Sequence, residues 1–232
     1  MRTHAWCRTA GRVREWNVVV TVDGPHYAEV KRALRDIGRV GKTEFYNVLV
    51  LRVDDPRAAL EQLRAWRAET PEAGERVAHF IPLTHVFNFH SAEAFEAGAL
   101  AAAQELAPTL ADKAFHVRGH RRGFRHRVSA RDEEAFVGNA VLEALAEAGT
   151  PGRIRFDDPD AVVAVEVVGQ RAGLSVWTRE DIHRYPELGL DRRVEPLEEG
   201  TGAEAGPERR GDGPPRQRRH PHPRGPRAVF RP

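Results

Sequence analysis

The sequence predicts an α+β protein with two folded units in tandem and a basic tail. Strand-like, β-branched runs alternate with helical apolar spacing from residue 15 to about residue 190. These patterns fall into two groups, and a stretch rich in Pro, Gly and Arg without periodicity follows them. The predicted limits are 15–88 and 89–192 for the two units and 193–232 for the tail, which we expect to be disordered.

The first unit has the order β-α-β-β-α-β. Its early elements are predicted at 16–22 (strand), 27–37 (helix ending at Gly38), 40–45 and 47–53 (strands). Asp55 and Pro56 begin the second helix, because Asp caps a first turn and Pro suits the first helical position. The last strand is predicted over 77–86, and Pro82 favours a sheet edge. This order is that of the ferredoxin-like fold.

The second unit combines helices and strands in a different order. Ser91 begins a helix that runs to about residue 107, a short strand covers 113–118, and a basic loop follows. Ser129 begins the next helix, which ends near Gly149. Two strands at 161–168 and 174–178 are joined as a hairpin through residues 169–173. The sequence therefore predicts an α/β unit.

Two acidic features of this unit have alternative interpretations. Residues 157–160, Asp-Asp-Pro-Asp, are interpreted as a turn that opens the following strand, with a Mg²⁺ site as the alternative. Glu166 stands alone in an apolar strand. We interpret it as an outward-facing residue on an edge strand, with a buried general base as the alternative.

Composition excludes several classes of protein. A single cysteine, Cys7, excludes a disulfide framework within the chain and a multi-cysteine zinc site. No apolar run approaches the roughly 20 residues of a membrane span, and no secretory signal precedes the first unit, so a cytoplasmic protein without membrane contact is expected. Nucleophile elbows, P-loops and dinucleotide fingerprints are missing, and we expect no metal and no cofactor.

Charge is unevenly distributed along the chain. The formal net charge is +2, but residues 206–232 hold 8 Arg against 2 acidic residues, which leaves 28 basic against 32 acidic residues in 1–205. Within that acidic body, residues 113–130 contain six Lys or Arg and no acid. Basic residues, glycines and flat rings between a strand and a helix N-terminus favour phosphate or RNA binding. The alternative is a solvated loop paired with acids of the next helix.

The candidate RNA-binding residues all come from this basic segment. They supply positive charge or a flat ring: Lys113, Arg118, His120, Arg121, Arg122, Phe124, Arg125 and Arg127. No catalytic residue is predicted. An acylphosphatase-like hydrolase is a remote alternative, because Gly119, Gly123 and Arg125 loosely follow that signature without its Val-Gln pair.

One family accounts for several of these patterns together. Residues 115–123 (Phe-His-Val-Arg-Gly-His-Arg-Arg-Gly), a helix, 156–160, and the strands at 162–169 and 172–176 resemble a THUMP domain. A ferredoxin-like unit directly before it is the usual companion, so the resemblance covers residues 15–190. It implies tRNA binding through the acceptor stem and 3′ end. Arg118, Arg121 and Arg122 match its basic motif and are expected to contact phosphates, whereas Asp160 and Glu166 match structural positions.

The resemblance also shapes the expected role. THUMP domains occur in tRNA-modifying enzymes, and we expect no catalytic domain here after Asp191. The sequence is similar to free-standing THUMP adaptors of tRNA cytidine N4-acetyltransferases. We therefore expect a non-catalytic tRNA-binding adaptor whose partners are tRNA and a separately encoded tRNA-modifying enzyme. The alternative is the RNA-binding subunit of a split tRNA methyltransferase or thiolation enzyme.

Overall fold

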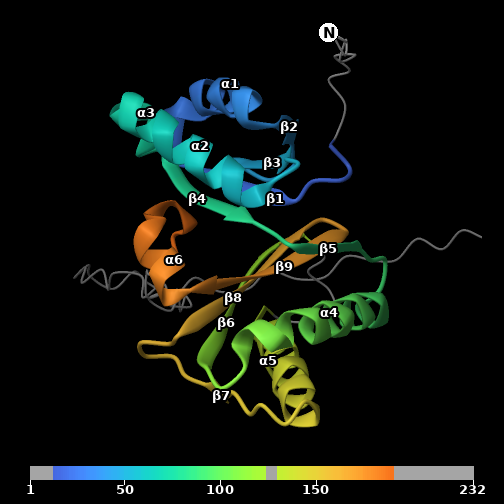
Figure 1. The fold of residues 1–232 in the computed structure, drawn as a ribbon. Helices are drawn as coiled ribbons and strands as arrows, with labels where there is room; N and C mark the ends of the chain where they lie inside the picture. Colours follow the sequence, from blue (N-terminus) through green and yellow to red (C-terminus); the bar gives the residue numbers. More distant parts are fainter. Residues whose placement is uncertain (1–12, 124–129, 191–232) are drawn as a thin grey trace, which may run out of the picture. The chain divides into compact units, whose positions relative to one another are not determined.

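The structure is a computed structural model that describes residues 13–123 and 130–190 (Figure 1). These residues belong to one compact unit. The predicted tail at 193–232 and three candidate site residues, Phe124, Arg125 and Arg127, lie outside the described residues. Among the helices that are described, none is long and apolar enough to cross a membrane.

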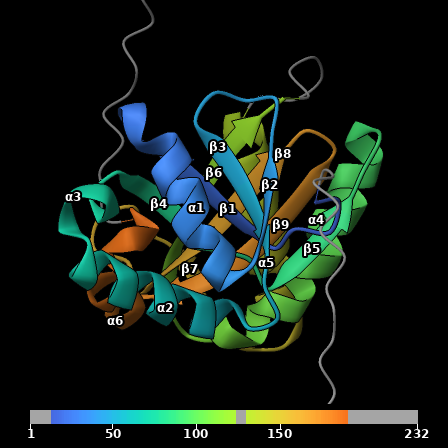
Figure 2. The ribbon, with the colours of Figure 1, turned by 90° about the horizontal axis from the view of Figure 1, so that it is seen from above.

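The first β-sheet has four strands, all pairs antiparallel, in the order β2-β3-β1-β4. Helices α1 and α2 lie on the same face of it (Figure 2). This is the predicted ferredoxin-like order, and β4 is an edge strand as Pro82 indicated. The elements are β1 (Val18–Val22), α1 (Tyr27–Ile37), β2 (Arg39–Lys42), β3 (Val48–Arg52), α2 (Pro56–Glu69), α3 (Pro71–Gly74) and β4 (Val77–Pro82), with a 3₁₀ turn at Gly24–His26.

The second sheet has five strands in the order β5-β9-β8-β6-β7. The β6 strand is parallel to β8 and to β7, whereas β9 is antiparallel to β8 and β5. The predicted fold class, a ferredoxin-like unit followed by a THUMP-like α/β unit, is confirmed. Its elements are β5 (His85–Asn88), α4 (Ala92–Leu106), β6 (Ala114–Arg122), α5 (Ala130–Glu147), β7 (Arg153–Ile154), β8 (Ala161–Val168), β9 (Arg171–Thr178) and α6 (Arg179–Arg184), with 3₁₀ turns at Ala107–Leu110 and Pro186–Leu188.

Local capping signals placed the helix starts. The Asp55 carboxylate accepts hydrogen bonds from the Arg57 and Ala58 amides, and the Ser91 hydroxyl accepts one from Ala94. Each bond satisfies an amide that has no partner within its helix. Both helix starts are as predicted.

The predicted strand at 77–86 is wrong, because it is two strands in two sheets. The chain leaves the first sheet after Pro82, where the Leu83 amide still bonds to Asn17, and the Thr84 amide then bonds to Leu174 of β9. Residues 85–88, predicted as part of the first unit, pair with β9. The domain limits at 88 and 192 stay a prediction.

The strand predicted at 113–118 is also longer than expected. The β6 strand continues to Arg122, and eight consecutive residues pair with β8. His120, Arg121 and Arg122 therefore lie on the same strand as Arg118 and not in a loop. Gly123 ends it with a φ of 90°, a conformation that favours glycine.

Successive side chains on the strands of the second sheet point to opposite faces, and each face belongs to a different hydrophobic core. On β8, Val163 and Val165 pack with the apolar faces of α4 and α5, which lie together against this sheet (Figure 1). Val162 and Ala164 instead pack with residues of the first sheet. One face of the second sheet thus belongs to its own helices and the other to a core shared with the first sheet. Even-numbered residues of β6 face the shared side.

Candidate nucleic-acid interface

A buried carboxylate organises the shared side of β6. Glu166 is 1% exposed on β8, which lies between β9 and β6. One carboxylate oxygen is 2.8 Å from His120 Nδ1, and the other accepts from Arg122 Nη1 at 2.7 Å. Arg122 Nη2 donates to the Thr21 hydroxyl of β1 at 2.9 Å. These bonds connect the two sheets.

The interpretation of Glu166 as an outward-facing edge residue is wrong. Its strand is covered on both sides by neighbouring strands, and its side chain faces the shared core. A carboxylate is stable there because it accepts two charge-assisted contacts from the adjacent strand. Its position on β8 has the structural character that the resemblance implied.

A second histidine extends this cluster from β4. The His79 ring lies 5.3 Å from the His120 ring, between centroids. Its Nδ1 is buried and has no hydrogen-bond partner among the described residues. Burial, followed by the nearby His120, lowers the pKa of His79. The cluster therefore favours a neutral His79 near the ion pair between Glu166 and Arg122.

The opposite side of β6 faces helix α5. Arg121 forms an ion pair with Glu133, and both side chains are almost fully buried. The Gly119 amide donates to Glu134 at 2.7 Å. Burial raises the pKa of Glu133 even though the Arg121 guanidinium opposes the shift. The alternative in which basic residues pair with acids of the next helix thus describes Arg121.

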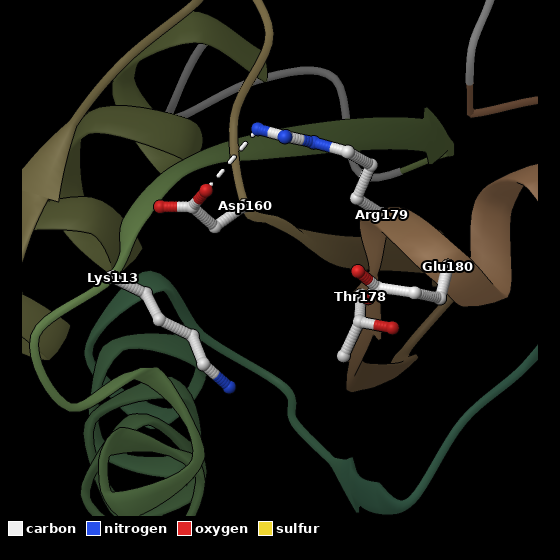
Figure 3. Close-up of a pocket in the computed structure, with 5 residues that line it drawn as sticks. All are labelled: Lys113, Asp160, Thr178, Arg179 and Glu180. Atoms are coloured by element: carbon white, nitrogen blue, oxygen red, sulfur yellow. Dashed lines mark hydrogen bonds and ion pairs between the residues drawn. The ribbon is translucent and has the colours of Figure 1, made fainter.

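Lys113 lies far from the other candidate residues. Nine residue steps of extended chain, roughly 30 Å, separate it from Arg122. Its ammonium donates to the Thr109 carbonyl at 2.8 Å and, in Figure 3, is directed away from Asp160. Lys113 lines a separate cavity of about 240 Å³ with Asp160 and Arg179. The structure brings together Arg118, His120, Arg121 and Arg122 on one strand, but not Lys113.

The Asp-rich segment forms a bend that leads into β8, as its interpretation as a turn predicted. The Asp160 carboxylate accepts from the Ala114 amide at 2.8 Å and from Arg179 at 3.1 Å. The Ala114 amide, with Arg179, lowers the pKa of Asp160. No group of three or more potential metal ligands occurs in residues 13–123 and 130–190.

Sequence reasoning missed a groove at the end of β6. A Cβ on Gly123 would lie 2.8 Å from Phe45 Cζ and 3.3 Å from Gly169 Cα, so the strand ends against both residues. Phe45 and Gly169 line an open groove of about 550 Å³ between the β2–β3 turn and the β8–β9 turn. Its lining comes from segments far apart in the sequence. The sequence gives little sign of the groove, because its lining residues Lys42 and Phe45 stand in an ordinary polar turn, Lys-Thr-Glu-Phe.

No protein-family model matches the sequence, and no curated protein matches it. Among solved structures, the fold is similar to PH1313 from Pyrococcus horikoshii, with a TM-score of 0.50 and 12% identity over 69% of this chain and 53% of that one. TrmN from Thermus thermophilus (TM-score 0.45, 18% identity) covers 68% of this chain and 44% of its own. A 4-thiouridine synthetase solved with RNA and bound ATP (TM-score 0.45, 16% identity) covers 71% and 42%.

These likenesses bear on the fold alone. The chain spans about half the length of the PH1313 chain and somewhat less of the other two. The likeness to PH1313 supports the THUMP-like arrangement of a ferredoxin-like unit and an α/β unit. The other two structures have lower TM-scores, and we base no conclusion on them.

Proposed function

We propose that the protein is a non-catalytic tRNA-binding adaptor that presents the acceptor stem and 3′ end of tRNA to a separately encoded modifying enzyme. The observation that carries the proposal is the place of the THUMP-like pattern in the fold. Residues 115–122 lie in β6, residues 162–168 lie in its parallel neighbour β8, and the hairpin strand β9 follows. A ferredoxin-like sheet precedes them, as it does in that family.

The four basic residues gathered on β6 have different parts in this proposal. Arg121 and Arg122 position the strand, because each is held by a buried carboxylate. Arg118 donates to the Leu190 carbonyl at 2.6 Å and keeps a partly exposed side chain at which a phosphate can bind. His120 is also partly exposed. Phosphate contacts are assigned to Arg118 and to the residues that follow Gly123.

The first test is tRNA binding by the full chain. Arg125→Glu combined with Arg127→Glu alters charge in the predicted loop without touching the Glu133 or Glu166 pairs. We expect at least a tenfold loss of tRNA affinity and a shallower dependence on salt, since each phosphate contact adds about 0.7 to the slope for single-stranded RNA. Arg32→Glu with Arg76→Glu makes the same charge change at exposed positions elsewhere. Equal loss in both double variants would contradict the site assignment.

A second test addresses the tRNA end and the partner. Removal of the 3′ CCA nucleotides is expected to weaken binding, and equal affinity for both tRNAs would contradict end recognition. The THUMP adaptors that the sequence resembles serve a cytidine N4-acetyltransferase, so a deletion strain is expected to lose N4-acetylcytidine from its tRNA. Loss of a methylated or thiolated nucleotide instead would favour the subunit of a split enzyme.

A further inference from the structure

The groove beside Gly123 contains a buried cation, Arg171, that forms no ion pair with a carboxylate of the described residues. Arg171 is 9% exposed at the start of β9. Its Nε donates to the Trp16 carbonyl at 2.9 Å and its Nη1 to the Asn88 side-chain oxygen at 3.0 Å, both neutral acceptors. Its guanidinium carbon lies 5.6 Å from the centre of the Trp16 ring. Burial lowers the pKa of Arg171, and the charge of Glu15 only partly opposes this.

Most of the other charged residues that line the groove are basic. Arg14 and Lys42 are exposed on its lining, and Glu44 is the acidic residue there. Lys31 lies beside Lys42, and burial together with the Lys42 ammonium lowers the pKa of Lys31. Like charges held together around a desolvated guanidinium favour an anion at this position.

The remaining lining suits a ligand with a flat ring. Phe45 is partly exposed at the β2–β3 turn, and Gln170 presents an exposed amide at the β8–β9 turn. The volume of about 550 Å³ is far larger than a phosphate needs and lies in the range of small-molecule sites. Aromatic stacking and amide hydrogen bonds are the contacts that proteins make to nucleobases.

We propose that this groove binds a nucleoside monophosphate, with the phosphate at Arg171 and Lys42 and the base against Phe45. The same chemical unit occurs as a free nucleotide and as a nucleotide of RNA. The proposal does not rest on the tRNA-adaptor role, because the positive charge of the groove comes from Arg14, Lys42 and Arg171, which lie outside the β6 motif.

The test is calorimetric titration of the full chain with AMP, CMP, inorganic phosphate and adenosine. We expect a nucleoside monophosphate to bind at least tenfold more tightly than phosphate or adenosine. Lys42→Glu, an exposed change, is expected to weaken it at least tenfold, whereas the control Arg76→Glu changes it less than twofold. Arg171→Lys retains the charge and is expected to retain part of the binding. Unchanged affinity in Lys42→Glu, or phosphate binding as tight as nucleotide binding, would overturn the proposal.

Competition separates the two sources of the ligand. If AMP displaces tRNA from the wild-type chain, the site takes a nucleotide of RNA; if both bind together, it takes a free nucleotide, and either result supports the site. If the chain binds AMP but not tRNA, the groove proposal is supported and the proposed tRNA-binding function is contradicted. If the chain binds tRNA and the Lys42→Glu variant binds AMP as tightly as the wild-type chain does, the proposed tRNA-binding function is supported and the groove proposal is contradicted.

Discussion

Arg122 and Arg171 are largely buried guanidinium groups in two regions that join the same two sheets, but they differ in what neutralises them. At the end of β6, Arg122 meets the buried Glu166 and the Thr21 hydroxyl. At the groove, Arg171 meets a backbone carbonyl and a side-chain amide. The first cation is neutralised within the protein and acts to hold the sheets together. The second retains its positive charge beside open space.

This difference separates structural from ligand-binding arginines. A motif rich in Arg suggests phosphate contacts, yet two of its members on β6 are already paired with Glu133 and Glu166. Nothing in the sequence around Arg171, a single arginine in a hairpin strand, indicates a binding residue. In the structure Arg171 makes its two side-chain hydrogen bonds to neutral acceptors and lines a groove with Lys42, where we propose that an anion binds. The presence or absence of a buried carboxylate partner distinguishes these arginines better than the density of Arg in the sequence does.

The largest effect is expected from removing the negative charge of the Glu166 cluster. Glu166→Gln leaves the Arg122 guanidinium buried without its carboxylate, which we expect to lower the free energy of unfolding by about 3 kcal/mol. Urea denaturation measures this. The matched control Glu143→Gln, exposed on α5, is expected to change stability by less than about 0.5 kcal/mol. Similar losses in both variants would show that Glu166 does not hold the sheets together.

A somewhat smaller loss is expected on the α5 side of β6. Arg121→Met removes the cation beside Glu133 and is expected to cost about 2 kcal/mol at pH 8. The pKa of Glu133 is raised by burial, so its stabilising contribution is present below the unfolded pKa of about 4.3 and is lost as pH rises through the folded value. The loss in Arg121→Met should therefore be smaller at pH 5 than at pH 8. Urea midpoints at both pH values test this, and a pH-independent loss would contradict it.

At the groove, the comparison predicts stabilisation by a ligand. AMP at five times its dissociation constant is expected to raise the free energy of unfolding of the wild-type chain by about 1 kcal/mol. Thermal denaturation at constant ionic strength measures the shift, which Lys42→Glu is expected to abolish. Stabilisation of equal size in Glu166→Gln would show that the two regions act independently, whereas its loss would show that the groove needs the Glu166 cluster.

The smallest effect concerns the pH dependence contributed by His79. Its pKa is lowered by burial, so its contribution is fully present above the unfolded pKa of about 6.5 and is lost as pH falls toward the folded value. His79→Gln is expected to reduce the loss of stability between pH 7.5 and pH 5.5 by about 0.5 kcal/mol. The exposed His183→Gln is the control. An unchanged pH slope in His79→Gln would show that the pKa of this histidine is the same in the folded and unfolded chain.

Local signals in the sequence predicted the elements that depend on neighbouring residues. Asp55 and Ser91 cap their helices because the bonded amides lie two or three residues away. Features that depend on partners far away in the chain were not predicted. The extent of β6 was missed because its His120 and Arg122 resemble loop residues until Glu166, more than 40 residues later, accepts their hydrogen bonds. The break after Pro82 was missed because β5 finds its partner in β9.

By itself the sequence determined the fold class, the helix limits and the uneven charge, because periodicity, caps and composition act within a few residues. The tertiary structure decided which charges remain available to a ligand. Parallel pairing of β6 with β8 brings Glu166 to His120 and Arg122, and the β8–β9 hairpin carries Arg171 to Trp16. Whether a guanidinium is paired or available depends on the residue packed against it, and for these arginines that residue lies far away in the chain.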